Sequence, residues 1–430
     1  KVATDNDRDS FVKILKIGEA NGKDIYSKNF QLFQKWIDEY VKVYPIPFYS
    51  FCVRLLHNCI LLPIECESQE VALRIFTTLN DRGMPLADSD IFKAQLYKYF
   101  NSEGKQDDFI KQWQELSEIC DDIPKSKLNQ IDEIFTQYMY WLRAKNEIKD
   151  TTVPGLRKYF EHSKYEKLKN AQVMRDVIAL SNFWKVLSEK EFDNQMGISK
   201  EALKYIHCLE YMPNAFWKYN LTVYFFAHKN ETNTMFSTEF ENFVKKTLAF
   251  CFVSFVIRPT VSDIKNASIP ALVEVAKKGE FIHTNDRLTK EAFTQQFHNI
   301  SSQSKTMIRP ILLWEAYQIP EQEIIGKNVR VEIEHILPKN WKSGSYKDWN
   351  KTDAEEYLEK IGNKILLDKK TNIQAGDGFF KKKKDDYYAK SPLKAIEKLA
   401  NDFPHDDWIK LDIENRENNL LNSFISFCDT

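Results

Sequence analysis

The chain has 430 residues, a length typical of two or three domains and ample for conventional hydrophobic cores. It contains only 12 Gly and 14 Pro, while aromatic residues reach 13%, so few tight turns are available. This composition argues against an all-β sandwich or propeller and predicts a mainly α, multidomain protein. With 43% hydrophobic and 29% charged residues, global disorder is not expected, and the net charge of −1 gives no overall nucleic-acid or membrane signature.

The cysteines and the apolar runs bear on the cellular compartment. The 7 cysteines form no C-x-x-C pair, which favours reduced thiols and a cytoplasmic location over a disulfide framework. Residues 248–257 form the longest apolar run, about half of what a bilayer span requires, and we interpret them as a buried helix. We therefore expect no membrane partner. The chain begins at Lys1 rather than Met, which suggests a fragment lacking its true N-terminus.

Residues 1–104 are predicted to form a partial α/β region. Helical patterns occupy residues 11–15 and 30–41, and residues 58–65 (NCILLPIE) are the best strand candidate, at an edge because of Pro63. A helix capped by Ser68 is expected to run to residue 79, and Gly83 breaks the chain before the next helix, which begins near residue 88.

Residues 105–324 are predicted to form a helical middle region. Amphipathic patterns mark helices near residues 128–143, 178–188, 200–211, 238–257 and 305–317. Aromatic residues at helical spacing are much more often core packing than base-stacking platforms, so we assign these to the core. Pro320 and Gly326 favour a boundary before a final unit, residues 325–430.

The final unit has a different pattern. Residues 329–337 alternate like a strand that ends at Pro338, residues 365–367 form a second short strand, and helices follow. Residues 360–398 hold 11 Lys and Arg against 5 Asp and Glu, whereas residues 399–430 hold 2 against 7. The near-zero net charge is therefore a cancellation between a basic segment and an acidic tail.

A cluster of polar residues in this unit could carry phosphodiester chemistry. Glu334 and His335 end the first predicted strand, and Asn363 and Asn372 follow in the basic segment. A neutral imidazole can act as a general base, and carboxylate and amide oxygens suit Mg²⁺ or Mn²⁺. Hydrolysis of a phosphodiester needs an activated water, a cation at the scissile phosphate and basic residues that hold the backbone.

This ordered set resembles the HNH, or ββα-metal, nuclease domain at the C-terminal end of GmrSD-type modification-dependent restriction proteins, over about residues 325–430. The resemblance implies that His335 is the base that activates the attacking water, that Asn363 orients this base by hydrogen bonding, and that Glu334 and Asn372 bind one divalent metal. The residues implied in DNA binding are Lys369, Lys370, Lys381, Lys382, Lys383 and Lys384. The pattern departs from the family at Lys364, where an apolar residue is usual, and at Asp377, where Asn is common.

Residues 75–93 resemble the distal part of the ParB/sulfiredoxin-like N-terminal domain of the same proteins. The resemblance places a nucleotide site in the vicinity of Asn80, Arg82, Asp90 and Lys93. The upstream Asp-Gly-Gln-Gln-Arg type motif of that family does not occur in this sequence. NTP as a cofactor therefore stays open, and a packing role for residues 75–93 is an equal alternative.

The leading hypothesis is a metal-dependent endonuclease of prokaryotic anti-phage defence that cleaves double-stranded DNA of phage or modified origin. One alternative is a catalytically inactive regulator whose HNH-like domain only docks nucleic acid. Another is a structural helical protein with a nucleotide-sensing end, in which lysines 381–384 are solvated surface. The sequence leaves the oligomeric state open, a homo-oligomer included.

Overall fold

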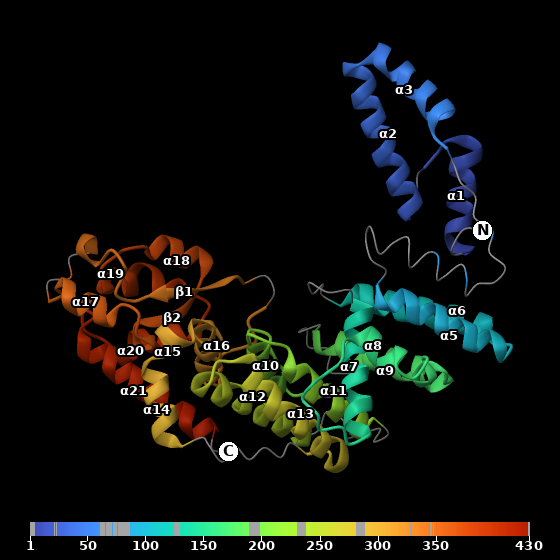
Figure 1. Cartoon of the computed structure of the whole chain (residues 1–430). Coiled ribbons are helices and arrows are strands. Elements are labelled where there is room, and N and C mark those ends of the chain that lie inside the picture. Colours follow the sequence, from blue (N-terminus) through green and yellow to red (C-terminus); the bar gives the residue numbers. More distant parts are fainter. Residues whose placement is uncertain are drawn as a thin grey trace. The chain divides into compact units, whose positions relative to one another are not determined.

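The computed structural model (Figure 1) describes residues 5–20, 22, 24–60, 65, 71, 75, 87–123, 130–188, 198–229, 238–280, 289–326, 329–344, 346 and 348–428. The chain divides into two compact units, Lys1–Pro85 and Leu86–Thr430. Helices dominate both units, so the prediction of a mainly α protein is confirmed. No helix in the described part of the chain is long and apolar enough to cross a membrane.

The first unit contains α1 (Asp5–Ile17), α2 (Ile25–Val43) and α3 (Pro45–Asn58). The Asp24 side chain caps α2 by accepting the backbone N–H of Ser27 at 2.9 Å, and α3 begins with proline at its first position. These helices confirm the two helical patterns predicted for residues 11–15 and 30–41. Of the strand predicted over residues 58–65, Asn58 is the last residue of α3 and residues 61–64 lie outside the described residues, as does most of the helix predicted after Ser68.

The helical part of the second unit begins at α5 and continues to α16. Its helices are α5 (Asp88–Ser102), α6 (Gln106–Asp122), α7 (Gln130–Lys145), α8 (Leu156–Glu161), α9 (Ala171–Ser188), α10 (Lys200–Leu209), α11 (Phe216–His228), α12 (Thr238–Ile257), α13 (Val261–Lys278), α14 (Lys290–His298), α15 (Ile300–Gln303) and α16 (Ile308–Tyr317). The aromatic residues pack in the core as expected; the rings of Tyr140 and Tyr219, for example, stack with centroids 3.7 Å apart. The apolar run at residues 248–257 forms the buried end of α12.

Two short strands follow the helical part. Strand β1 (Val331–His335) pairs antiparallel with β2 (Lys364–Asp368), and His335 lies opposite Lys364. The elements that connect or follow them are α17 (Lys351–Tyr357), the 3₁₀ turn η5 (Ile361–Asn363), α18 (Lys369–Ala375), α19 (Phe380–Lys382), the π-helical turn η6 (Lys383–Tyr387), the 3₁₀ turn η7 (Tyr388–Lys390), α20 (Lys394–Asp402) and α21 (Lys410–Cys428). Asp368 ends β2 and caps α18 by accepting the N–H of Thr371 at 3.0 Å. Both strands of the final unit were therefore predicted correctly.

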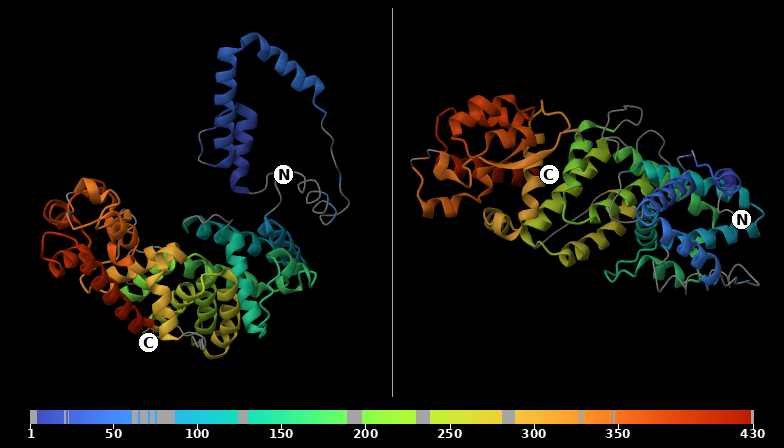
Figure 2. Two further views of the ribbon diagram at one scale, coloured as in Figure 1. Left: turned by 60° about the vertical axis from the view of Figure 1, so that its left-hand side comes forward. Right: turned by 90° about the horizontal axis from the view of Figure 1, so that it is seen from above.

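The second unit has one continuous hydrophobic core, which includes Phe92 in α5 and Phe427 in α21. Helix α5 packs on α6 and α7, while α21 packs on α12, α14 and η5 (Figure 2). This core includes residues on both sides of positions 104 and 324, where the sequence pattern changes, and the division into three domains stays a prediction.

Candidate active site

Glu334 and His335 lie at the end of β1 with their side chains on opposite faces, because side chains alternate along a strand. The Glu334 side chain lies on the face that contacts η6 and η7. There its Oε1 accepts hydrogen bonds from Lys383 Nζ at 2.6 Å and from the Tyr388 hydroxyl at 3.0 Å. His335 faces Glu359 on the other side. The two adjacent residues therefore have separate environments.

The Glu334 environment is a buried polar network. Glu334 is 5% exposed and Lys383 is 0% exposed, and Lys383 Nζ also donates to the carbonyl oxygen of His335 at 3.0 Å. Burial raises the pKa of Glu334 although the positive charge of Lys383 opposes the shift. Burial and the nearby Glu334 also raise the pKa of Tyr388 well above its ordinary value. Lys383 thus has its ammonium group inside the protein, away from the surface where the resemblance implied a phosphate contact.

The imidazole of His335 is held in its neutral form. Burial lowers its pKa to about 4, so at pH 7 one ring nitrogen carries a lone pair that can accept a proton. Nε2 is buried and has no hydrogen-bond partner among the described residues, although Glu359 Oε1 lies 3.5 Å away. A catalytic role is one explanation for a buried nitrogen without a close partner. The ring therefore has the charge state that a general base requires.

Glu359 is a site residue that the sequence analysis missed. Its Oε2 accepts a hydrogen bond from Lys364 Nζ at 2.6 Å, and Lys339 Nζ lies 3.6 Å from its Oε1. Partial burial acts to raise the pKa of Glu359, but the hydrogen bond and charge of Lys364 outweigh it and lower the pKa to about 2. The signal was Lys364 itself, because a lysine on a buried strand needs a carboxylate partner.

Asn363 fixes the backbone that follows β1. It is fully buried; Oδ1 accepts from the N–H of Leu337 at 2.8 Å and from Trp408 Nε1 at 3.1 Å, and Nδ2 donates to the Leu337 carbonyl at 3.1 Å. It was expected to orient the base by a hydrogen bond, yet its side-chain bonds go to the backbone of Leu337 and Leu358 and to Trp408. The preceding Gly362 is required by packing, since a Cβ there would lie 2.1 Å from the Ile413 carbonyl oxygen of α21.

Asn372 lies on α18 and contacts Glu332 rather than Glu334. Its Nδ2 donates to Glu332 Oε2 at 3.3 Å, and Glu332 shares a face of β1 with Glu334. Among the described contacts none joins Asn372 to Glu334, and no group of three or more His, Cys, Asp or Glu in the described ranges could hold a metal. Carboxylate and amide oxygens nevertheless suit Mg²⁺, which often uses one or two protein carboxylates and retains waters. The residue types therefore suit a divalent ion, although the Glu334 carboxylate is bound to Lys383 and Asn372 contacts Glu332.

The lysines expected to bind DNA are not equivalent in the fold. Lys370, Lys381 and Lys382 are exposed and Lys369 is partly buried. Lys384 is buried, and its Nζ donates to the Phe403 carbonyl at 2.9 Å. Lys381 pairs with Asp406 of the acidic tail at 2.8 Å, so part of the basic segment is neutralised by the tail that follows it.

Comparison with known families identifies both ends of the chain. The C-terminal domain of GmrSD restriction endonucleases matches residues 284–423, and the N-terminal domain of the same endonucleases matches residues 2–97. The chain is a GmrSD-type protein. The resemblance inferred from the motifs is thereby confirmed. No curated protein matches this GmrSD-type chain.

The matched C-terminal range of this GmrSD-type protein contains all of the site described above. It starts before α14, so helices α14–α16 belong to the matched range together with β1 and β2. In the N-terminal range, Asn80 and Arg82 lie outside the described residues. Asp90 is exposed in the first turn of α5, and Lys93 Nζ lies 5.5 Å from the centre of the Trp113 ring. Burial lowers the pKa of Lys93.

Proposed function

We propose that this GmrSD-type protein is a metal-dependent DNA endonuclease of the HNH, ββα-metal type that acts in restriction of foreign DNA. The observation that carries the proposal is the neutral His335 at the end of β1, beside the ionised Glu359, within the matched C-terminal range. Two antiparallel strands followed by α18 are consistent with the ββα order. The family description supports DNA as the substrate.

His335 is the general base in this proposal. We assign the proton of the neutral ring to Nε2, which faces Glu359 Oε1 at 3.5 Å, so that Nδ1 accepts a proton from the attacking water. The Glu359 carboxylate stabilises the imidazolium that forms and fixes the plane of the ring. Contacts of this kind often shorten when substrate binds. Asn363 supports the arrangement by holding the backbone at Leu337.

Glu334 and Asn372 would hold the divalent ion, Mg²⁺ or Mn²⁺, with Glu332 as a further oxygen donor on the same face. When bound, such an ion supplies positive charge to the scissile phosphate and to the leaving 3′ oxygen. Lys383 and Tyr388 both bond Oε1 of Glu334 and so fix the orientation of its carboxylate.

Double-stranded DNA is the proposed substrate, of phage origin or carrying modified groups, in the cytoplasm. The exposed Lys370 and Lys382 and the exposed Lys339 beyond β1 are the cations available for its phosphates. A nucleotide site in the vicinity of Asn80, Arg82, Asp90 and Lys93 remains a prediction from the resemblance.

The test is plasmid cleavage by the full chain with Mg²⁺ or Mn²⁺. His335→Ala is expected to lower the cleavage rate by about a hundredfold or more, because general-base catalysis contributes about 10²–10⁴-fold. His162→Ala, at an exposed position after α8, is the matched control and should cut at the parental rate. A His335→Ala protein that cuts as fast as the parent would overturn the assignment. Salt-dependent DNA binding by the parent without any metal-dependent product would favour the regulator instead.

A further inference from the structure

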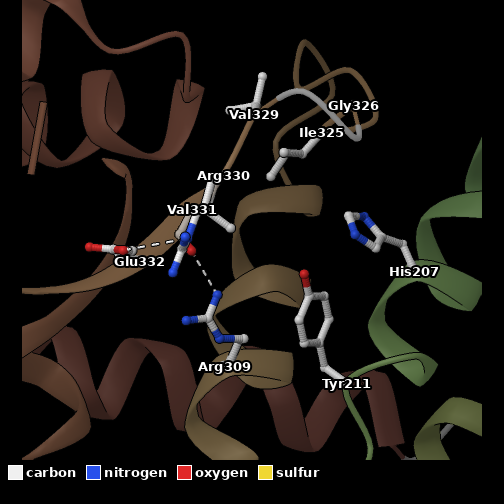
Figure 3. A pocket seen from close by; sticks show the side chains of 9 residues that line it. All are labelled: His207, Tyr211, Arg309, Ile325, Gly326, Val329, Arg330, Val331 and Glu332. Carbon is white, nitrogen blue, oxygen red and sulfur yellow. Dashed lines mark hydrogen bonds and ion pairs between the residues drawn. The ribbon is translucent and has the colours of Figure 1, made fainter. Parts of the chain in front are cut away.

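A cavity of about 420 Å³ lies at the start of β1, between this strand and helices α10 and α16 (Figure 3). Its lining includes Tyr211, Arg309, Ile325, Arg330 and Glu332. Of these residues only Glu332 has a role in the proposal above, as a further oxygen donor to the divalent ion. The volume falls within the range of about 300–1,000 Å³ that is typical of sites for small molecules.

One wall of the cavity is flat and aromatic. The Arg309 guanidinium carbon lies 5.6 Å from the centre of the Tyr211 ring, and Arg309 Nη1 donates to the Val331 carbonyl at 2.8 Å. Figure 3 shows the Tyr211 ring between Arg309 and His207, with its hydroxyl directed toward the side where Ile325 lies. Arg309 is thus anchored to the strand and supports the ring. The His207 ring lies on the other side of Tyr211, with centroids 5.7 Å apart and planes at 46°, and Tyr211 is 37% exposed, so part of the ring is open for stacking of a planar group.

The other wall is charged. Arg330 is exposed, and its Nε lies 3.7 Å from Glu332 Oε1, which is longer than a hydrogen bond. A guanidinium recognises phosphate through paired N–H donors, and a carboxylate can accept from an exocyclic amino group of a base. A planar stacking wall facing an arginine and a carboxylate fits a ligand with a flat heterocycle and an anionic group.

We propose that this cavity binds a single nucleotide, with its base on the Tyr211 ring and its phosphate at Arg330. The proposal builds on the endonuclease function, because Val331 and His335 are four residues apart on one strand, about 13 Å at 3.3 Å per residue. A nucleotide turned out of a duplex docked at His335 lies within reach of the cavity. The same chemistry would also admit a free mononucleotide, and the two sources are separated by experiment.

The experiment measures binding by the full chain in EDTA, where cleavage does not contribute. The probes are a fluorescein-labelled duplex, followed by anisotropy, and each of the four deoxynucleoside monophosphates, followed by calorimetry. Tyr211→Ala is expected to weaken binding about tenfold, and Tyr211→Phe, which keeps the ring, should bind like the parent. Arg330→Ala should weaken binding. It should also reduce the slope of the logarithm of the binding constant against the logarithm of the salt concentration by about one. Arg175→Ala, an exposed arginine on α9, is the matched control.

Weaker duplex binding by the variants assigns the cavity to a nucleotide extruded from DNA, and weaker monophosphate binding assigns it to a free nucleotide. Binding of both probes that is unchanged in Tyr211→Ala and Arg330→Ala overturns the proposal. Arg330 is exposed, so its variant tests the proposal even if Tyr211→Ala fails to fold. The plasmid-cleavage assay tests the endonuclease function separately, because a protein that never cuts DNA can still show these changes in binding.

Discussion

The four consecutive lysines 381–384 lie in different environments. Lys381 pairs with Asp406, Lys382 is exposed, Lys383 is fully buried against Glu334, and Lys384 donates to backbone carbonyls. The helical turn places the third and fourth side chains inward, toward β1 and the segment after α20. A run of one residue type carries no periodicity, so the sequence could not distinguish the inward lysines from the outward ones.

Lys382→Met and Lys383→Met are a matched pair of variants that separate the two roles. Lys383→Met leaves Glu334 buried without its cation and is expected to lower the free energy of unfolding by about 3–5 kcal/mol. Lys382→Met should change it by less than about 0.5 kcal/mol while weakening DNA binding and its salt dependence. Urea denaturation and binding titrations at several salt concentrations measure both. Equal stability of the two variants would contradict the buried pair.

At the scale of elements, the ends of β1 and β2 form the core of the site. His335 pairs in register with Lys364, and Glu359 contacts both side chains from the segment before η5. The strands themselves could be predicted, because alternation ending at Pro338 and the apolar residues 365–367 are local signals. The contacts of Glu359, Tyr388 and Trp408 could not be predicted, because they join segments far apart in the sequence. Alternation of side chains along a strand likewise implies opposite faces for Glu334 and His335, but it does not reveal the contact between Glu334 and Lys383.

Glu359→Gln tests whether this carboxylate positions the base. We expect kcat for plasmid cleavage to fall about tenfold to a hundredfold with little change in KM. The reason is that the ring becomes a cation only during proton transfer, so the missing carboxylate raises the energy of the transition state and not that of the bound substrate. Glu359→Gln also takes the carboxylate partner from the buried Lys364, so some loss of stability is expected, although Lys364 Nζ still donates to the Glu359 carbonyl at 2.8 Å. Glu356→Gln, an exposed residue paired only weakly with Lys360, is the control.

Recovery of kcat in Glu359→Asp, where the charge is retained, would support an electrostatic role. A Glu359→Gln protein with the parental kcat, or one in which only KM changes, would exclude Glu359 from positioning His335. Thermal unfolding of each variant shows whether a lost rate reflects lost structure.

At the scale of the molecule, Arg416 joins the strand region to the helices. Its Nη2 donates to both carboxylate oxygens of Glu315 on α16, at 2.7 and 2.6 Å, and its Nη1 donates to the Lys364 carbonyl at 2.6 Å. Arg416 is 6% exposed, and burial raises the pKa of Glu315 although Arg416 opposes the shift. A single side chain of α21 thus fixes the start of β2, where the site is formed, to the helical part of the same unit.

Arg416→Met is therefore expected to destabilise the second unit by about 3–5 kcal/mol, because it leaves the partly buried Glu315 without its cation and removes three hydrogen bonds to backbone carbonyls. Arg258→Met, at an exposed position whose nearest carboxylate oxygen is 3.9 Å away, should be nearly neutral. The double variant Arg416→Met, Glu315→Leu removes both charges and should regain part of the loss.

Because the core is continuous from α5 to α21, tryptophan fluorescence and circular dichroism should report one transition for residues 86–430 in the parent. If instead the strand region unfolds in a separate step in the parent, the shared core does not act as one cooperative unit, and Arg416 would stabilise only its local contacts.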